Sequence, residues 1–221
     1  MTDETQRIFN LMQNSMQAIS DSGVWRYFLK TAAWHFKYSF NDQVLIFAQK
    51  SEATACAGMD DWVNKTKRWV KKDASPIALV RENGNQYYLD YVFDISDTSS
   101  FGKREIKLWQ YDKRYEEAVI QTLEWSFGKL KVTTSDIDAI ICLANKEVND
   151  RKGDYLRELK YVKGDSFLSG LDDVNLDLRF RQTAAASVAY MFMQRMGLQP
   201  DNTFDEYDFQ YIRDFNTVET M

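Results

Sequence analysis

Hydrophobic residues recur at helical spacing through the first fifty residues. The pattern predicts three helices, over residues 4–20, 25–36 and 44–48. Ile8, Met12 and Met16 fall on one face of the first helix, which makes it amphipathic. Gly23 separates the first helix from the second.

Two strand-like runs in the middle of the chain predict a β-hairpin. Residues 76–80 and 86–93 have the composition of strands. Asn83-Gly84 between them is typical of a tight hairpin turn. Further extended segments are expected at residues 53–57 and 105–109.

A helix is expected between the first extended segment and the hairpin. Asp60 is of the residue type that caps helix N-termini. Trp62, Val63 and Trp69 supply the apolar positions that follow, so the predicted helix includes Trp69.

The second half of the chain is predicted to be helical. Apolar periodicity recurs near residues 112–128, 135–150, 153–162, 172–196 and 204–214. Asp172 is an expected N-cap, and Gly197 with Pro200 ends the longest helix. The expected fold class is α+β, mostly helical with a small antiparallel β-hairpin sheet. We expect an α+β domain over residues 1–110, with a helical domain or extension over 111–221 packed on it.

Composition indicates a globular protein with an acidic balance. Of the 221 residues, 44% are hydrophobic and 14% aromatic, which is enough for a packed core. The formal net charge of −5 counts against a dedicated binder of duplex DNA, because affinity for phosphate comes largely from counterion release. The charge fits an acidic surface that meets a basic partner, and it also allows a local basic groove.

Cysteine usage and hydropathy predict a cytoplasmic protein. Cys56 and Cys142 are far apart and lack CxxC spacing, so we expect reduced, structural thiols. The N-terminus is polar and lacks the apolar core of a signal peptide. No apolar run approaches the roughly 18 residues of a membrane span, so we expect no membrane association. The sequence does not indicate an oligomeric state.

The residue sets of common catalytic sites are missing from the sequence. His35 is the only histidine, so a zinc-binding HExxH helix cannot form. Its place between Trp34 and Phe36 favours a structural or surface role over nucleophilic catalysis. The phosphate-binding patterns GxxxxGK[ST] and GxGxxG do not occur. We therefore expect no catalytic residues, no cofactor and no metal site.

Acidic residues are frequent but are not arranged as a metal site. Pairs occur at Asp60-Asp61, Glu116-Glu117 and Asp172-Asp173. Metal-dependent nucleases need carboxylates that converge on divalent ions, whereas consecutive acids on a helix point to different sides. Helix caps and solvated faces are therefore the favoured interpretation. The acidic segment 201–214 is either a charged, exposed helix face or a patch for a cationic partner.

The one concentrated basic element is residues 65–72, KTKRWVKK, called the basic segment below. It contains Lys65, Lys67, Arg68, Lys71 and Lys72 around Trp69. Cations around an aromatic ring are typical of a single-strand groove, where phosphates are neutralised while a base stacks on the ring. Arg81 and Tyr87 of the hairpin are further residues expected at this surface. The alternative is a solvated helix end with Trp69 in the core beside Trp62.

Several sequence blocks share a pattern with a known family. They are YSFNDQVLIFAQ, the basic segment with the strand PIALV, and YVFDISDT. Together, residues 38–98 resemble the N-terminal domain of ArdC-type antirestriction proteins. The resemblance implies a domain that binds single-stranded DNA, with Tyr38, Asn41 and Gln43 as family-motif residues. Later blocks such as LWQYDKRYEEAVIQTLEWSFG resemble the N-terminal region of very large proteins of integrative and conjugative elements, in which helicase and methylase domains lie downstream.

The sequence departs from this family in the basic turn. The family's turn contains glycines, as in VKKGxKG, whereas residues 70–76 read VKKDASP. The freedom of glycine to adopt positive φ is therefore lost there, and Asp73 adds a negative charge. The chain also ends at Met221 without the family's downstream domains, so we expect either a fragment or a free-standing derivative.

Three functional hypotheses follow. The preferred one is a non-catalytic single-stranded-DNA-binding module of a mobile genetic element, with an antirestriction or conjugative role. The second is an anti-defence protein, anti-CRISPR or antirestriction, whose acidic surface binds a host nuclease such as a Cas or restriction enzyme. The third is a cryptic hydrolase, whose activity would depend on His35 or on a bound metal.

Overall fold

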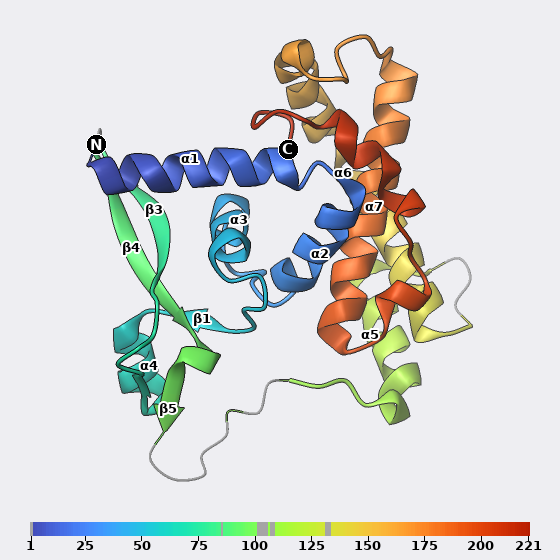
Figure 1. The fold of residues 1–221 in the computed structure, drawn as a ribbon. Coiled ribbons are helices and arrows are strands. Elements are labelled where there is room, and N and C mark those ends of the chain that lie inside the picture. Colours follow the sequence, from blue (N-terminus) through green and yellow to red (C-terminus); the bar gives the residue numbers. More distant parts are fainter. Residues whose placement is uncertain (1, 85, 101–105, 107–108, 131–133) are drawn as a thin grey trace. The chain divides into compact units, whose positions relative to one another are not determined.

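The computed structural model describes residues 2–84, 86–100, 106, 109–130 and 134–221 (Figure 1). The chain divides into two compact units, the first made of residues 1–18 and 30–109 and the second of residues 19–29 and 110–221. Helices make up most of the described chain and the strands form small antiparallel sheets, which confirms the α+β, mostly helical fold class. The sequence predicted domains over residues 1–110 and 111–221, and that domain assignment stays a prediction. In the structure, residues 19–29 group with the second compact unit.

The first unit combines helices with two small sheets. Its elements are α1 (Asp3–Ala18), α3 (Phe40–Gln49), β1 (Cys56–Ala57), α4 (Met59–Thr66), β2 (Arg68–Val70), β3 (Ile77–Asn83), β4 (Gln86–Asp94), η1 (Ile95–Asp97) and β5 (Thr98–Ser100). α2 (Ser22–Ala32) begins in the second unit and ends in the first. One sheet has the strand order β1-β4-β3, and β2 pairs with β5 in the other.

The predicted hairpin between β3 and β4 is confirmed. The two strands pair antiparallel up to Asn83 and Gln86, so only positions 84 and 85 form the connection. Gly84 has a φ of 60°, a conformation that glycine adopts without a steric penalty. Position 85 lies outside the described residues.

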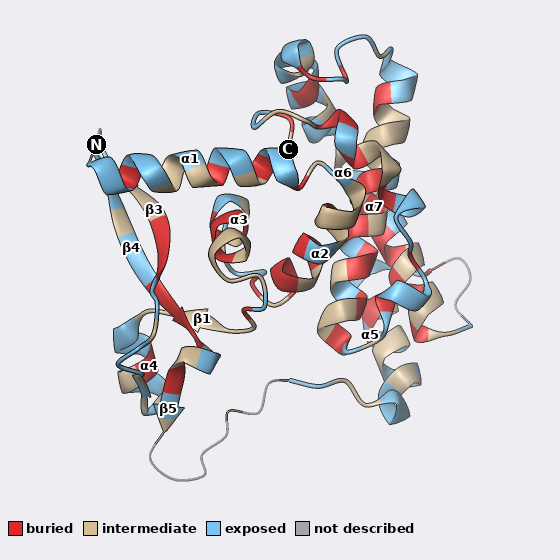
Figure 2. Ribbon diagram, viewed as in Figure 1, coloured by how far each residue is buried: buried red, intermediate tan, exposed pale blue. Residues whose placement is uncertain are grey.

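The core of the first unit is formed where α1, α3 and β3 contact one another. All three elements have buried positions, red in Figure 2. The buried apolar side chains are Met12, Met16, Val44, Leu45, Ile46, Ile77 and Leu79. Burying apolar surface is the main favourable term in folding, so these contacts hold the hairpin against the helices.

Gln49 of α3 covers one residue at the outer edge of β3. Its Nε2 donates to the carbonyl oxygen of Ala78, and its Oε1 accepts from the Ala78 backbone N–H, both at 2.9 Å. β3 is the last strand in the order β1-β4-β3, so in the described sheet it has a neighbouring strand on one side only. On its open side, the Ala78 N–H and carbonyl oxygen bond to Gln49 instead of to another strand.

The helix expected to run from Asp60 through Trp69 is shorter than predicted. Its N-cap is Gly58, so Asp60 lies in the first turn. The helix ends at Thr66 because Lys67 adopts a left-handed conformation, with φ of 57°. Trp69 then lies on β2, where backbone hydrogen bonds to β5 replace the helical ones. The helical placement of Trp69 was therefore wrong.

The second unit is a set of packed helices. Its main elements are α5 (Glu116–Phe127), α6 (Asp136–Val162) and α7 (Asp173–Met196), with short 3₁₀ helices η2 (Lys113–Tyr115), η3 (Lys163–Asp165), η4 (Pro200–Asn202) and η5 (Tyr207–Asp214). α6 contacts both α5 and α7, and η5 packs on α7. None of the helices in the described ranges is both long and apolar enough to cross a bilayer.

The helix ends observed in the second unit agree only partly with those predicted from the sequence. Asp172 is the N-cap of α7 and accepts from the Asn175 N–H at 2.8 Å, and Gly197 ends that helix with φ of 76°, as predicted. The two helices expected over 135–150 and 153–162 are one continuous helix, since an exposed glycine such as Gly153 costs about 1 kcal/mol without ending a helix. The segment near 204–214 is a 3₁₀ helix. The strand expected at 105–109 falls mostly outside the described residues.

Candidate nucleic-acid interface

The basic segment follows α4 through a left-handed turn. The N–H of Lys67 donates to the carbonyl oxygen of Trp62, which closes the last turn of the helix. The next three residues form β2, in which Arg68 pairs with Ser100, Trp69 with Ser99 and Val70 with Thr98. Because side chains alternate along a strand, Trp69 points to the opposite face from Arg68.

The two tryptophans near this turn have opposite environments. Trp62 is only 4% exposed, and its indole Nε1 donates to the Phe93 carbonyl oxygen at 2.9 Å. Trp69 is 42% exposed and lies opposite the small, exposed residue Ser99. The alternative interpretation, with Trp69 in the core beside Trp62, was therefore wrong. The side chain of Trp69 is partly exposed on β2.

Cations of the basic segment bind neutral oxygens. Arg68 donates to Oγ1 and to the carbonyl oxygen of Thr98, at 2.6 and 3.0 Å. The Lys71 Nζ donates to the Ser96 carbonyl oxygen at 2.7 Å, and the Lys67 Nζ donates to the carbonyl of Asn64. Carbonyl and hydroxyl acceptors carry no formal charge, so the positive charge of these three side chains is not neutralised by their partners.

Two carboxylates near the segment, those of Asp61 and Asp97, form ion pairs with lysines. Lys65 forms an ion pair with Asp61 at 2.7 Å, one helical turn before it. Asp97, whose backbone oxygen accepts from the Lys71 N–H, is paired through its carboxylate with Lys50. Lys72 is exposed. Lys65 is thus the only cation of the segment that is paired with a carboxylate of a described residue.

Arg81 and Tyr87 are not brought to the basic segment. Tyr87 lies near the tip of the hairpin, seven residues before the end of β4, which is about 23 Å along a strand. Trp69 lies on β2, which pairs with β5, and β5 lies beyond the other end of β4 (Figure 1). Tyr87 meets the ring of Phe9 edge-on, with centroids 5.5 Å apart. The expected surface therefore reduces to the residues around Trp69.

Arg81 is held by two carboxylates of the first unit. Its Nη1 lies 2.7 Å from Asp42 Oδ1, and its Nε lies 3.4 Å from Asp90 Oδ2. Burial lowers the pKa of Arg81, but the hydrogen bond and charge of Asp42, with those of Asp90, raise it overall. This guanidinium joins α3 to the hairpin and is not available to a phosphate without breaking those pairs.

Two of the three family-motif residues have structural partners. The Tyr38 hydroxyl donates to the Cys56 carbonyl oxygen at 2.8 Å. Gln43 Nε2 donates to the carbonyl oxygens of His35 and Tyr38, at 3.1 and 2.9 Å. These bonds fix the connection between α2 and α3 and attach β1 to it. Asn41 is exposed on α3.

Asp94 organises the connection to β5, which the sequence patterns missed. Its carboxylate accepts from the backbone N–H groups of Thr54, Ala55 and Ser96, at 2.8 to 3.0 Å. Burial raises the pKa of Asp94, but these hydrogen bonds outweigh it and hold the pKa below its usual value. The signal in the sequence was the aspartate at the head of the DISDT block, which caps η1 and so positions Thr98, whose Oγ1 accepts from Arg68.

Groups considered for catalysis have structural environments. His35 is 2% exposed, its Nδ1 lies 2.8 Å from the Thr31 carbonyl oxygen, and burial lowers its pKa. Its Nε2 has no hydrogen-bond partner among the described residues. The acid pairs act as caps and surface partners: Asp172 caps α7, and Glu116 accepts from the Asp136 N–H. In the described ranges, no group of three or more His, Cys, Asp or Glu side chains could hold a metal ion.

Comparison with protein-family models, with curated proteins and with solved structures finds no match to this chain.

Proposed function

We propose that this chain is a non-catalytic module that binds single-stranded DNA through the basic segment. The observation that carries the proposal is the exposed indole of Trp69 on a strand flanked by cations whose partners are uncharged. A base stacks on such a ring while the cations follow the phosphates. Unpaired bases are accessible to an indole, whereas those of a duplex are stacked on one another.

The distribution of charge between the two units supports this proposal. The residues of the first unit include 13 Lys or Arg and 12 Asp or Glu, a net charge of +1. The second unit has 15 Lys or Arg and 21 Asp or Glu, a net charge of −6. The acidic balance of the whole chain therefore does not oppose phosphate binding at Trp69. The ArdC-like sequence blocks lie in the first unit and are the support for an antirestriction or conjugative role.

Fluorescence anisotropy with a labelled oligothymidine tests the proposal. We expect binding that weakens steeply with salt and that exceeds binding to a duplex of equal length. A triple variant, Lys67→Ala, Lys71→Ala and Lys72→Ala, should reduce the slope of log K against log salt by about 2, at about 0.7 per cation for a single strand.

A matched control removes three exposed cations of the second unit. Lys113→Ala, Lys129→Ala and Arg213→Ala change the net charge by the same amount and should leave the salt slope unchanged. The proposal fails if the unmodified protein does not bind oligothymidine at low salt. It also fails if the control variant loses as much affinity as the triple variant of the basic segment.

A second candidate function is direct inhibition of a host nuclease, such as a Cas or restriction enzyme. The observation that favours it is the net charge of −6 in a unit that also exposes large aromatic side chains, including Trp125 at 89% and Tyr161 at 84%. Acidic surface is complementary to the basic channel of a nuclease, and exposed aromatics are frequent anchors of protein interfaces.

A nuclease inhibition assay distinguishes the two candidates. Under inhibition, cleavage by a Cas or restriction enzyme falls in proportion to added protein, and Trp125→Ala weakens the effect while Trp69→Ala does not. Under DNA binding alone, cleavage of duplex substrate is unchanged, and oligothymidine binding depends on Trp69.

A further inference from the structure

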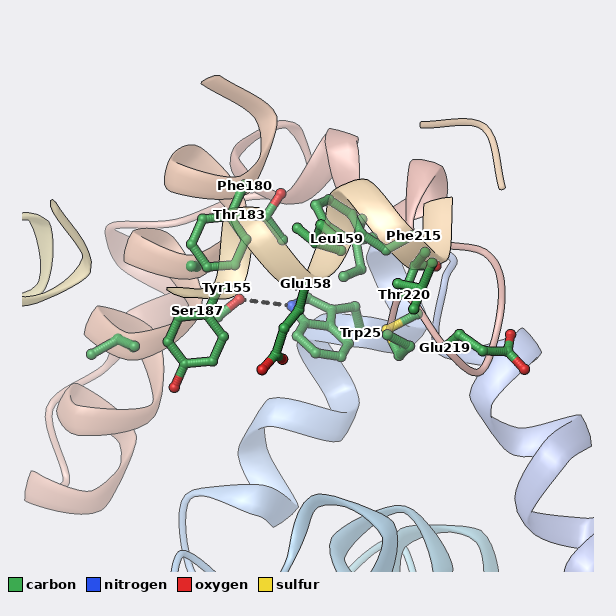
Figure 3. A pocket seen from close by; sticks show the side chains of 15 residues that line it. Trp25, Tyr155, Glu158, Leu159, Phe180, Thr183, Ser187, Phe215, Glu219 and Thr220 are labelled. Atoms are coloured by element: carbon green, nitrogen blue, oxygen red, sulfur yellow. Dashed lines mark hydrogen bonds between the residues drawn. The ribbon is translucent and has the colours of Figure 1, made fainter. Parts of the chain in front are cut away.

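A cavity of about 380 Å³ lies in the second unit, between α6, α7 and the residues that follow η5 (Figure 3). Trp25, in the part of α2 that belongs to this unit, forms one wall. A volume of this size lies within the range of small-molecule sites, about 300–1,000 Å³. The basic segment is in the other unit, so this cavity is a separate site.

Aromatic rings make up much of the cavity wall. Trp25 is buried, and its indole Nε1 donates to Ser187 Oγ at 2.9 Å, the bond drawn in Figure 3. Tyr155 of α6 and Phe180 of α7 stack on each other, with centroids 5.7 Å apart and planes 26° from parallel. These flat apolar surfaces suit a hydrophobic body, and the indole donor of Trp25 is already used.

Thr183 supplies a polar group without a partner at this site. Thr183 lines the cavity, is 6% exposed, and its Oγ1 has no hydrogen-bond partner among the described residues. A helical threonine commonly donates to the carbonyl four residues earlier, and this one does not. A buried hydroxyl without a partner is destabilising, so an occupant with a hydrogen-bonding group is favoured there.

The charged residues that line the cavity are both acidic. Glu158 lies on α6 and Glu219 follows η5, and both are exposed. Neither carboxylate forms an ion pair with a described residue. Their negative charge attracts a cation and repels an anion, and the effect is strengthened near apolar walls that exclude water.

From these contacts, the geometry points to a binding site for a small hydrophobic cation, an aromatic or alkyl amine with one ammonium group. The ring or chain lies against Trp25, Phe180 and Tyr155. The ammonium group meets the Glu158 carboxylate. A cation over an aromatic face gains further attraction from the ring quadrupole.

Three probes of similar shape test this site in the full chain: phenethylamine, 2-phenylethanol and phenylacetate. Binding is followed by the shift of the Trp25 indole N–H signal in ¹H–¹⁵N spectra. Phenethylamine is expected to bind saturably, about tenfold more tightly than the alcohol, because a charge-assisted hydrogen bond adds about that factor. Phenylacetate is expected not to bind.

Two substitutions test whether the Glu158 carboxylate and the Thr183 hydroxyl contribute to binding. Glu158→Gln should bring the affinities for the amine and the alcohol to within about threefold of each other. Thr183→Val keeps the side-chain volume, removes the unpartnered hydroxyl, and should weaken binding of both ligands without unfolding the protein. Glu147→Gln, on the same helix and paired with Arg151, is the matched control and should leave the preference unchanged.

Three results would overturn the assignment. One is the absence of any saturable shift of the Trp25 signal with phenethylamine up to about 20 mM. Another is equal affinity for phenylacetate and phenethylamine. The third is a Glu158→Gln protein, folded by its amide spectrum, that retains the full preference for the amine.

Discussion

The backbone N–H of Lys67 donates to the carbonyl oxygen of Trp62, and Lys67 is the only non-glycine residue of the described chain with positive φ. In an L-residue this conformation brings Cβ close to the following carbonyl oxygen. The turn between α4 and β2 therefore contains a strained lysine. Helices usually have glycine at this position.

Lys67→Gly should stabilise the protein by about 1 kcal/mol, because it removes the Cβ strain of the left-handed conformation. Urea unfolding followed by circular dichroism measures the change. Lys65→Gly, inside α4, is the control and should destabilise by about 1 kcal/mol. A Lys67→Gly protein that is less stable than the parent would contradict the turn geometry described above.

Trp62→Ala and Trp69→Ala should separate stability from binding. Truncating the buried indole of Trp62 should cost about 3–5 kcal/mol of unfolding free energy, because it leaves a cavity in the core. Removing the exposed indole of Trp69 should cost far less stability and weaken oligothymidine binding by about 1–3 kcal/mol, the contribution of one stacked base. Urea unfolding and anisotropy titration, applied to both variants, give the four values. If Trp69→Ala bound as well as the parent, stacking on this indole would be excluded.

Asp94 should make the protein less stable in acid. Hydrogen bonds from Ser96, Ala55 and Thr54 hold the pKa of this buried carboxyl below its usual value despite the opposing effect of burial. As the pH falls below about 4, the unfolded chain takes up a proton before the folded one, so stability is lost through the folded pKa.

The measurement for Asp94 is the unfolding free energy at a series of pH values. Asp94→Asn should lower stability at neutral pH by about 1–3 kcal/mol and flatten the acid dependence. Asp73→Asn, at an exposed site, should change stability by less than about 0.5 kcal/mol. Equal acid dependence in the Asp94→Asn protein and the parent would disprove the role assigned to this carboxylate.

His35 should remain neutral in the folded protein at a pH where a free histidine is charged. Burial lowers its pKa, and the hydrogen bond to Thr31 and the charge of Asp94 offset this only in part. The unfolded chain binds a proton near pH 6.5, so His35 contributes stability above that pH and the contribution is lost as the pH falls toward the folded pKa. Because the chain has one histidine, a single imidazole Cε1–H signal reports the titration. A midpoint at or above 6.5 in the folded protein would contradict the burial described for this ring.

Sequence patterns predicted the turns and helix ends that are set by residues next to them in the sequence. The β3–β4 connection depends on Gly84 at positive φ, and α7 begins at the Asp172 carboxylate and ends at Gly197. All three signals lie within a few residues of the feature they specify. Single-sequence patterns detect such signals because no distant contact is needed to interpret them.

The α4–β2 region could not be predicted in this way. Trp69 stands seven residues after Trp62, which fits one face of a helix, and a lysine in place of glycine gave no sign of a left-handed turn. What decides the structure is the pairing of β2 with β5, about thirty residues later, and the bonds between Arg68 and Thr98. Trp69 could be named from the sequence as a candidate site residue, which stays a prediction, while its exposure and its strand are set by contacts distant in the sequence.

The two hydrogen bonds between the Gln49 side chain and the Ala78 backbone have a consequence for association with other chains. An open strand edge is a template on which a further strand can add. At Ala78 the amide of Gln49 already occupies both the donor and the acceptor that an incoming strand would need. A foreign peptide, or a second copy in an aggregate, that paired with β3 at Ala78 would first have to displace the Gln49 side chain, so this position of the strand edge is protected from strand addition.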